Sequence, residues 1–191
     1  MALTLTINQN DINTLCDRVE GAQEGAYAIH KLTDDYPSMT IDDGYAVQAE
    51  LRKRYLAKGH QLVGWKAGLT SKAKMEQMGV HVPSIGFLTN KMARTEDVGI
   101  KTLASVVADN GSSARFVTGK AKLSPEDINL QKISVVMKKN GEQIAQGESS
   151  AVLGHPAEAI AMLVNILSEQ DEILPAGSFV MSGGITEAFP V

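Results

Sequence analysis

The sequence has very little cysteine and no strong excess of charge of either sign. Its 191 residues include a single cysteine, Cys16, and the formal net charge is -4 at pH 7. One cysteine excludes an intrachain disulfide, and nucleic-acid binding requires a basic face that this charge balance does not favour. The composition therefore favours small-molecule partners, no nucleic-acid partner and a reducing compartment.

Long apolar runs are also missing. No run reaches the roughly 18 residues of a membrane span, and the first residues lack the basic-then-apolar layout of a signal peptide. We therefore expect a cytoplasmic protein with no membrane partner. Hydrophobic residues at 43% and charged residues at 21% are ordinary for one globular domain, in which Cys16 is expected to be a small core residue.

Helix signals dominate the first 60 residues. Asn10 is predicted to cap a helix, because the apolar residues that follow repeat at i, i+3, i+4 and i+7. Thr40 with Asp43 resembles a capping box and predicts a second helix that ends before Gly59. Residues 24–39 are expected to be irregular. The basic residues of the second helix's last turns are expected to form a solvated face rather than a binding patch: Arg52, Lys53, Arg54 and Lys58.

The rest of the chain alternates short strands with turns. Strands are predicted at residues 62–66, 86–88, 105–108 and 179–181, and from Arg115 onward. Asn140-Gly141 predicts a hairpin between residues 135–139 and 143–147. Short helices are predicted after Ser71, ending at Gly79, and at residues 124–127. A longer helix opens at Pro156, with an apolar face wide enough to be mostly buried.

Lys66 is the first candidate functional residue. It follows a strand-like run, and glycines on both sides would let a ligand approach the backbone closely. Such a position suits a substrate-binding cation. The alternative is a lysine whose stem crosses an apolar strand end while its ammonium extends into water.

Two turns rich in glycine and hydroxyl residues are the next candidates, at residues 109–113 and 182–186. The first is either a loop held by local side-chain hydrogen bonds or a nest whose N–H groups and serine hydroxyls bind a carboxylate. His155, at the start of a helix, is expected to make structural hydrogen bonds rather than to act as a catalyst.

Five motifs in order resemble the family of 2-hydroxypentadienoate hydratases and 4-oxalocrotonate decarboxylases. They are Tyr36-Pro37-Ser38-Met39-Thr40, Gly64 to Thr70, Val107 to Ser113, Leu153-Gly154-His155-Pro156 and Ser182-Gly183-Gly184-Ile185-Thr186. The resemblance implies an α+β, fumarylacetoacetate hydrolase-like fold. Within a single domain spanning 1–191, a helical part of about 1–60 would pack on a mixed β-roll of about 61–191.

The resemblance also implies a site and partners. Lys66 would be the catalytic lysine, and Leu69, Ser112 and Thr186 would bind the substrate, a 2-oxo dicarboxylic acid. Mg²⁺ or Mn²⁺ would hold the 2-oxo acid end in the meta-cleavage degradation of aromatic compounds. A homo-oligomer that associates with a partner hydratase is implied as well.

Residue 84 departs from the hydratases of the family, which carry an aspartate directly after the proline that matches Pro83. Here the residue is Ser84. Hydration needs a positioned acid or base, whereas loss of CO₂ needs only a sink for electrons. The sequence therefore favours decarboxylation of 2-oxo-3-hexenedioate to 2-hydroxypenta-2,4-dienoate. The alternatives are the dienoate hydratase and a metal-less subunit that binds a partner.

The family's metal-binding glutamates are a second departure. Their segment should fall between Met92 and Ser105 and is absent, and the closing strands of the roll, expected after Val191, are omitted as well. Glu96 and Asp97 are adjacent, so they would point to opposite sides of an extended chain and are expected to be solvated loop charges. No metal ligand is assigned. A Cα–Cα separation far above about 3.8 Å is expected within residues 92–105.

Overall fold

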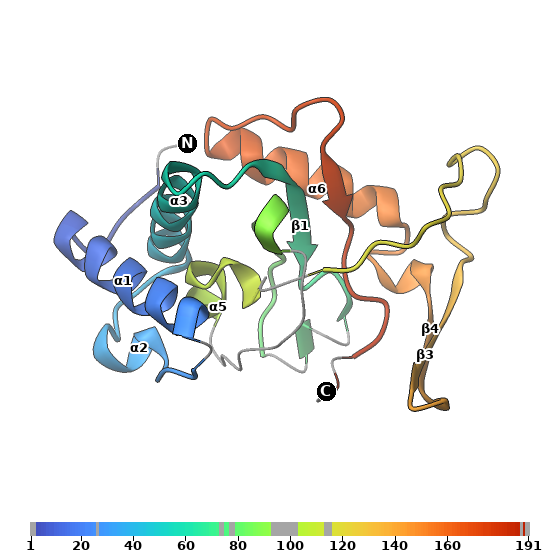
Figure 1. Cartoon of the computed structure of the whole chain (residues 1–191), viewed down its shortest axis with the longest axis horizontal. Coiled ribbons are helices and arrows are strands. Elements are labelled where there is room, and N and C mark those ends of the chain that lie inside the picture. The colour runs from blue at the N-terminus through green and yellow to red at the C-terminus, as the bar shows by residue number, and fades with distance from the viewer. Residues whose placement is uncertain are drawn as a thin grey trace.

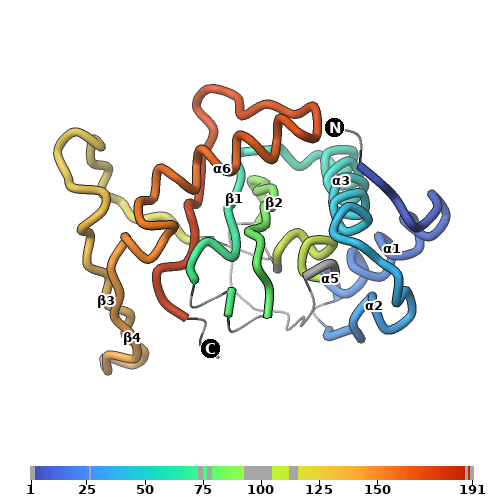
Figure 2. Tube along the Cα trace, turned by 180° about the vertical axis from the view of Figure 1, so that it is seen from behind, coloured from blue at the N-terminus to red at the C-terminus, as the bar shows by residue number. Residues whose placement is uncertain are grey.

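The structure is a computed structural model that describes residues 3–25, 27–72, 75–76, 79–92, 103–112, 116–187 and 189. Helices surround a three-stranded sheet, and a separate hairpin stands away from them (Figures 1 and 2). The expected mixture of helices and strands is confirmed. Most of the 92–105 segment in which a chain break is expected, residues 93–102 with Glu96 and Asp97, lies outside the described residues.

The first part of the chain is helical, as predicted. Its helices are α1 (Gln9–Gly25), α2 (Leu32–Asp35) and α3 (Ile41–Ala57). Asn10 is not the cap of α1, because the helix already begins at Gln9 and the side-chain oxygen of Asn8 accepts hydrogen bonds from the N–H groups of Asn10 and Asp11. The short helix α2 interrupts the segment that was expected to be irregular.

Helix α3 begins with the predicted capping box. The hydroxyl of Thr40 accepts from the N–H of Asp43, whose carboxylate accepts in return from the N–H of Thr40. Of the basic residues at its end, the arginines Arg52 and Arg54 are less solvated than expected, with side chains 18% and 22% exposed, whereas Lys53 is 77% exposed. The guanidinium of Arg52 lies 5.1 Å from the centre of the Trp65 ring and pairs with Glu172, so this side chain is a packing element.

The sheet is built from β1 (Leu62–Gly68), β2 (Ser84–Thr89) and β5 (Phe179–Met181), in the order β2-β1-β5. Strand β1 pairs with β2 antiparallel and with β5 parallel. All six residues of β2 are buried, so this strand is covered on both faces. The buried core joins the sheet to α1 and α3, and Cys16 lies in it with no exposed surface, as expected.

Residues 105–108 form a helix and not the predicted strand. Helix α5 (Leu103–Ala108) is followed by the 3-10 turn η2 (Asn110–Ser112). A run of four mostly apolar residues is compatible with a strand or a helix, and tertiary contacts decide which of the two forms. The buried side-chain amide of Gln48 donates to the carbonyls of Val107 in α5 and Ile85 in β2, at 2.8 and 3.0 Å.

Other turns follow the sequence more closely. The hairpin β3 (Ser134–Lys139) and β4 (Glu142–Glu148) is confirmed, and Asn140 and Gly141 have the positive φ angles of 52° and 88° that its turn requires. Residues 124–127 form a turn rather than a helix, and Phe116 lies outside any strand. The short 3-10 helices are η1 (Asn90–Met92) and η3 (Ser149–Ala151).

The helix predicted after Ser71 lies only partly within the described residues. Gly79 has a φ of 64°, and the N–H of Val80 donates to the carbonyl of Met75 at 3.0 Å. These features are typical of a glycine that ends a helix.

Helix α6 (Pro156–Glu169) packs on the sheet through buried Ala159, Leu163 and Leu167. Its apolar face is not mostly buried as expected, because Ile160 and Val164 are 39% and 41% exposed. Within the part of the chain that the structure describes, Ser149–Glu169 is long and apolar enough to cross a membrane by length and composition alone.

Candidate active site

At one end of the sheet, called the Lys66 edge below, the ends of three strands meet. Strands β1 and β5 run parallel with Lys66 opposite Met181, and β1 ends with Gly68 opposite Ser84, the first residue of β2. The carboxyl ends of β1 and β5 and the amino end of β2 therefore meet there. Lys66, Leu69 and the 182–186 turn, all of them predicted site residues or segments, lie on this edge.

Lys66 is partly buried and lies against the η2 turn. Its Nζ donates a hydrogen bond to the carbonyl of Gly111. A Cβ added at Gly111 would lie 3.0 Å from Lys66 Cε and 3.3 Å from Nζ, and the φ of Gly111 is 61°, so the position favours glycine. Strand β1 continues to Gly68, so Lys66 does not end the strand as predicted.

The η2 turn is held against β2 by Asn110. The side chain of this buried residue accepts from the N–H of Phe87 at 2.7 Å and donates to its carbonyl at 2.8 Å. A Cβ at Gly86 would lie 2.7 Å from the Asn110 carbonyl oxygen, so the turn can approach only a glycine. The described part of the predicted loop, residues 109–112, is thus a turn docked on the sheet, and it brings the backbone of Ser112 close to Lys66.

The segment after β1 contacts the glycine-rich turn after β5. Leu69 has a φ of 55°, which is unusual for a residue with a side chain. Next to it, the buried side chain of Thr70 lies against Gly183. Thr186 lies further along the same turn, where its hydroxyl donates to the carbonyl of Glu187 at 3.1 Å.

Ser84 is 3% exposed at the start of β2, and a Cβ added at Gly68 would lie 2.9 Å from its Oγ. The neighbouring N–H of Ile85 donates to the hydroxyl of Tyr45 at 3.2 Å. Burial raises the pKa of Tyr45 to about 12, so this hydroxyl is protonated at neutral pH.

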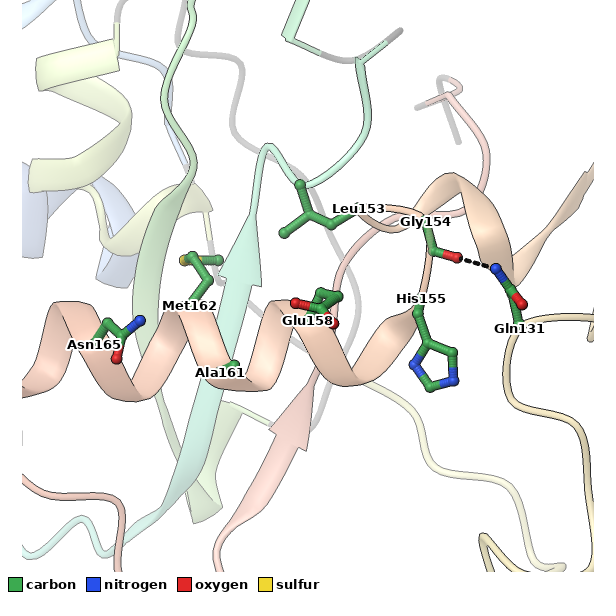
Figure 3. A pocket seen from close by; sticks show the side chains of 8 residues that line it. All are labelled: Gln131, Leu153, Gly154, His155, Glu158, Ala161, Met162 and Asn165. Carbon is green, nitrogen blue, oxygen red and sulfur yellow. Dashed lines mark hydrogen bonds between the residues drawn. The ribbon is translucent and has the colours of Figure 1, made fainter.

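His155 has the expected structural role. Its Nδ1 accepts from the N–H of Ala157 at 3.1 Å and caps α6. It lines an open hollow of about 640 Å³ at the start of the helix. Figure 3 labels the residues that line this hollow. Gln131 donates to the carbonyl of Gly154 at 3.0 Å there, which ties the segment before the hairpin to α6.

No metal centre is visible in the described parts of the chain. Among those residues, no group of three or more histidine, cysteine, aspartate or glutamate side chains could hold a metal ion. The described residues therefore do not fit a divalent cation by themselves, and Glu96 and Asp97 lie outside them.

Asn110, Thr70 and Gly183 lie in the candidate site, although the sequence assigned them no individual role. The sequence pointed to Gly183 and Thr70 only in part, because both lie in motifs that resemble those of the family, 182–186 and 64–70. The pairing between them joins segments that are distant in sequence, so no local pattern shows it. The hydrogen bonds between the Asn110 side chain and the Phe87 backbone also join distant segments, so no local pattern shows them.

Comparison with known proteins identifies close relatives. A scan against protein-family models finds no match. The 4-oxalocrotonate decarboxylases of Pseudomonas putida and of Pseudomonas sp. strain CF600 are 37% and 39% identical over 240 residues, 97% of this chain and 91% of each relative. The 2-hydroxyhexa-2,4-dienoate hydratase of Comamonas testosteroni is 28% identical over 236 residues, 94% of this chain and 89% of the relative.

Solved structures agree with the sequence comparison. Two structures of 4-oxalocrotonate decarboxylase from Pseudomonas putida G7, one complexed with calcium and acetate and the other with magnesium and adipate, each superpose with a TM-score of 0.90. Each is 36% identical and is matched over 98% of this chain and 92% of its own.

The alignment is longer than the chain. At least 49 aligned positions, the difference between 240 and 191, face gaps in this chain. The relatives thus carry residues that this chain lacks. The identity and coverage establish that the chain belongs to the family of 4-oxalocrotonate decarboxylases and 2-hydroxydienoate hydratases.

Proposed function

We propose that this protein decarboxylates 4-oxalocrotonate (2-oxo-3-hexenedioate) with the aid of a divalent cation such as Mg²⁺. The products are CO₂ and 2-hydroxypenta-2,4-dienoate, in the meta-cleavage degradation of aromatic compounds. The observation that carries the proposal is the family relationship, because two decarboxylases match this chain at 37% and 39% identity, above the Comamonas testosteroni hydratase at 28%, while a third decarboxylase matches at 26%.

Ser84 supports the same choice between the two reactions. A hydratase must protonate carbon and deliver water to the diene, which needs a titratable group in place. Ser84 and the neighbouring Tyr45, which keeps its proton at neutral pH, do not offer such a base at the amino end of β2.

Lys66 is the residue proposed to act on the reacting atoms. When CO₂ leaves, its bonding electrons move through the conjugated chain and collect on the 2-oxygen as a dienolate. A fixed ammonium beside that oxygen stabilises the developing charge and needs no reorganisation during the step. The hydrogen bond to Gly111 holds the ammonium in place before substrate arrives.

Leu69, Ser112 and Thr186 are proposed to bind the substrate. The positive-φ backbone of Leu69 directly follows β1, and the η2 turn that contains Ser112 lies against Lys66 of the same strand, so backbone N–H groups there can orient the carboxylates. The hydroxyl of Thr186 would exchange its bond to Glu187 for one to a carboxylate.

Dependence on a divalent cation is supported by the relatives' structures with magnesium and with calcium. The adipate in one of them supports a dicarboxylic acid as ligand. We also propose a single domain over 1–191 whose residues from about 61 onward form the family's roll, a cytoplasmic location, and a homo-oligomer that associates with the hydratase of the next step.

The purified protein tests this function. With Mg²⁺ and 4-oxalocrotonate it should release CO₂, and a chelator should abolish the release until Mg²⁺ is restored. Supplied with 2-hydroxypenta-2,4-dienoate, it should form no 4-hydroxy-2-oxo acid. Hydration without decarboxylation would establish the hydratase instead, and neither activity would favour the metal-less subunit.

A further inference from the structure

The side chain of Thr70 contains a buried hydroxyl that the fold does not use. Thr70 is 1% exposed, and its Oγ1 has no hydrogen-bond partner among the described residues. Its backbone is fixed nonetheless, because its carbonyl accepts from the N–H of Leu153 at 2.9 Å. An unpaired buried hydroxyl destabilises the folded protein relative to one that has a hydrogen-bond partner.

A glycine, Gly183, lies directly against this hydroxyl. A Cβ added at Gly183 would lie only 1.7 Å from Thr70 Oγ1 and 2.9 Å from its Cβ, and Gly183 has a φ of 137°. No residue with a side chain fits there. Glycine at 183 therefore allows the turn after β5 to lie directly against the hydroxyl, at the Lys66 edge, where Leu69 also lies.

We propose that Thr70 is a substrate-binding residue whose hydroxyl donates a hydrogen bond to a carboxylate of the dicarboxylic substrate. A threonine hydroxyl is a donor as well as an acceptor, so it can pair with a carboxylate, which only accepts. The unmet hydrogen bond of the free protein is then satisfied by the ligand. The inference rests on the proposed function in that it takes its ligand from that reaction.

Thr89 provides a matched control on the neighbouring strand. It is also a fully buried threonine, but its hydroxyl lies 3.0 Å from Nδ1 of His60. It pairs with Leu62, at the opposite end of β1 from Thr70. Replacing either threonine by valine keeps the shape and removes the hydroxyl, so the two variants separate a ligand-binding hydroxyl from a structural one.

The test measures adipate binding with Mg²⁺ present, unfolding in urea without ligand, and the steady-state kinetics of decarboxylation. Thr70→Val should bind adipate roughly 10- to 100-fold more weakly, the loss expected for a hydrogen bond to a charged group, while its urea midpoint is unchanged or higher. Thr70→Ser should recover affinity to within about threefold. Thr89→Val should show the opposite pattern, with a lower midpoint and unchanged affinity.

Wild-type adipate affinity in Thr70→Val would overturn the inference, as would a lowered urea midpoint with unchanged affinity, which is the signature of a structural hydroxyl. Adipate binding tests the role of Thr70, whereas turnover of 4-oxalocrotonate tests the proposed function, so the two proposals can fail separately. A wild-type protein that binds adipate through Thr70 but releases no CO₂ refutes the reaction alone. One that binds no adipate and releases no CO₂ refutes both.

Discussion

The side chain of Asn110 hydrogen bonds to Phe87 as a neighbouring strand would. Its amide accepts from the N–H and donates to the carbonyl of the same residue, at 2.7 and 2.8 Å. Strand β2 is an edge strand of the described sheet, so these two bonds pair backbone groups that no strand reaches. With a φ of 55°, Asn110 also starts the turn that carries Gly111 to the ammonium of Lys66.

Replacement of Asn110 by alanine should therefore destabilise the fold strongly. Two buried backbone groups lose their partners, and the expected decrease in the free energy of unfolding is about 3 kcal/mol. Urea unfolding followed by the fluorescence of Trp65, the only tryptophan and 2% exposed, measures it. Asn165→Ala on the exposed side of α6 is the control. A decrease below about 1 kcal/mol would show that water replaces the amide.

Replacement of Lys66 by methionine should lower decarboxylation about a hundredfold, on the order of 3 kcal/mol of barrier, and leave the fold intact. Methionine keeps an apolar stem and removes only the charge. Turnover of 4-oxalocrotonate with Mg²⁺ is the measurement. Lys53→Met, at a lysine whose side chain is 77% exposed, should retain wild-type turnover. Near-normal rates in the Lys66 variant would refute the assignment.

Asp43 should control part of the stability in acid. Burial by itself raises the pKa of this carboxyl, but hydrogen bonds from the backbone and hydroxyls of Thr40 and Thr6 outweigh it and lower the pKa to about 2. Because the folded pKa lies below the unfolded value of 3.8, the contribution is full above that value and is lost as pH falls toward 2.

The wild-type protein should accordingly lose about 2 kcal/mol through this group between about pH 4 and about pH 2. Asp43→Asn should be less stable at neutral pH and should lack this part of the acid dependence. Urea unfolding of both proteins across that range is the measurement. Parallel curves would show that Asp43 is not responsible.

Ser84→Asp should not create a hydratase. Residue 84 is 3% exposed and packs beside Gly68, so an aspartate there is a buried acid without an arranged water on the correct face of the diene. Formation of 4-hydroxy-2-oxo acid from 2-hydroxypenta-2,4-dienoate is the assay. Substantial hydration by this single variant would show that residue 84 alone decides between the two reactions.

The features predicted well from sequence are those decided by neighbouring residues. The capping box of Thr40 and Asp43 and the turn at Asn140-Gly141 are local hydrogen-bond and φ requirements, and both are present. The prediction of a strand at residues 105–108 was wrong because these residues pack against α3, including Gln48, which is far away in sequence. Of the candidate site, Lys66 and the two turns could be singled out from sequence, whereas the contacts that join them depend on tertiary structure.

The parallel pairing of Trp65 with Val180 also bears on the order of folding. Helices α1 and α3 and the β1–β2 pair need only contacts within the first 89 residues, so they can form early. The Lys66 edge must wait for the strand that begins at Phe179. Contacts between distant segments form slowly because the intervening chain must first be ordered into a loop. Binding competence should therefore be acquired after most of the core, as one of the last events of folding.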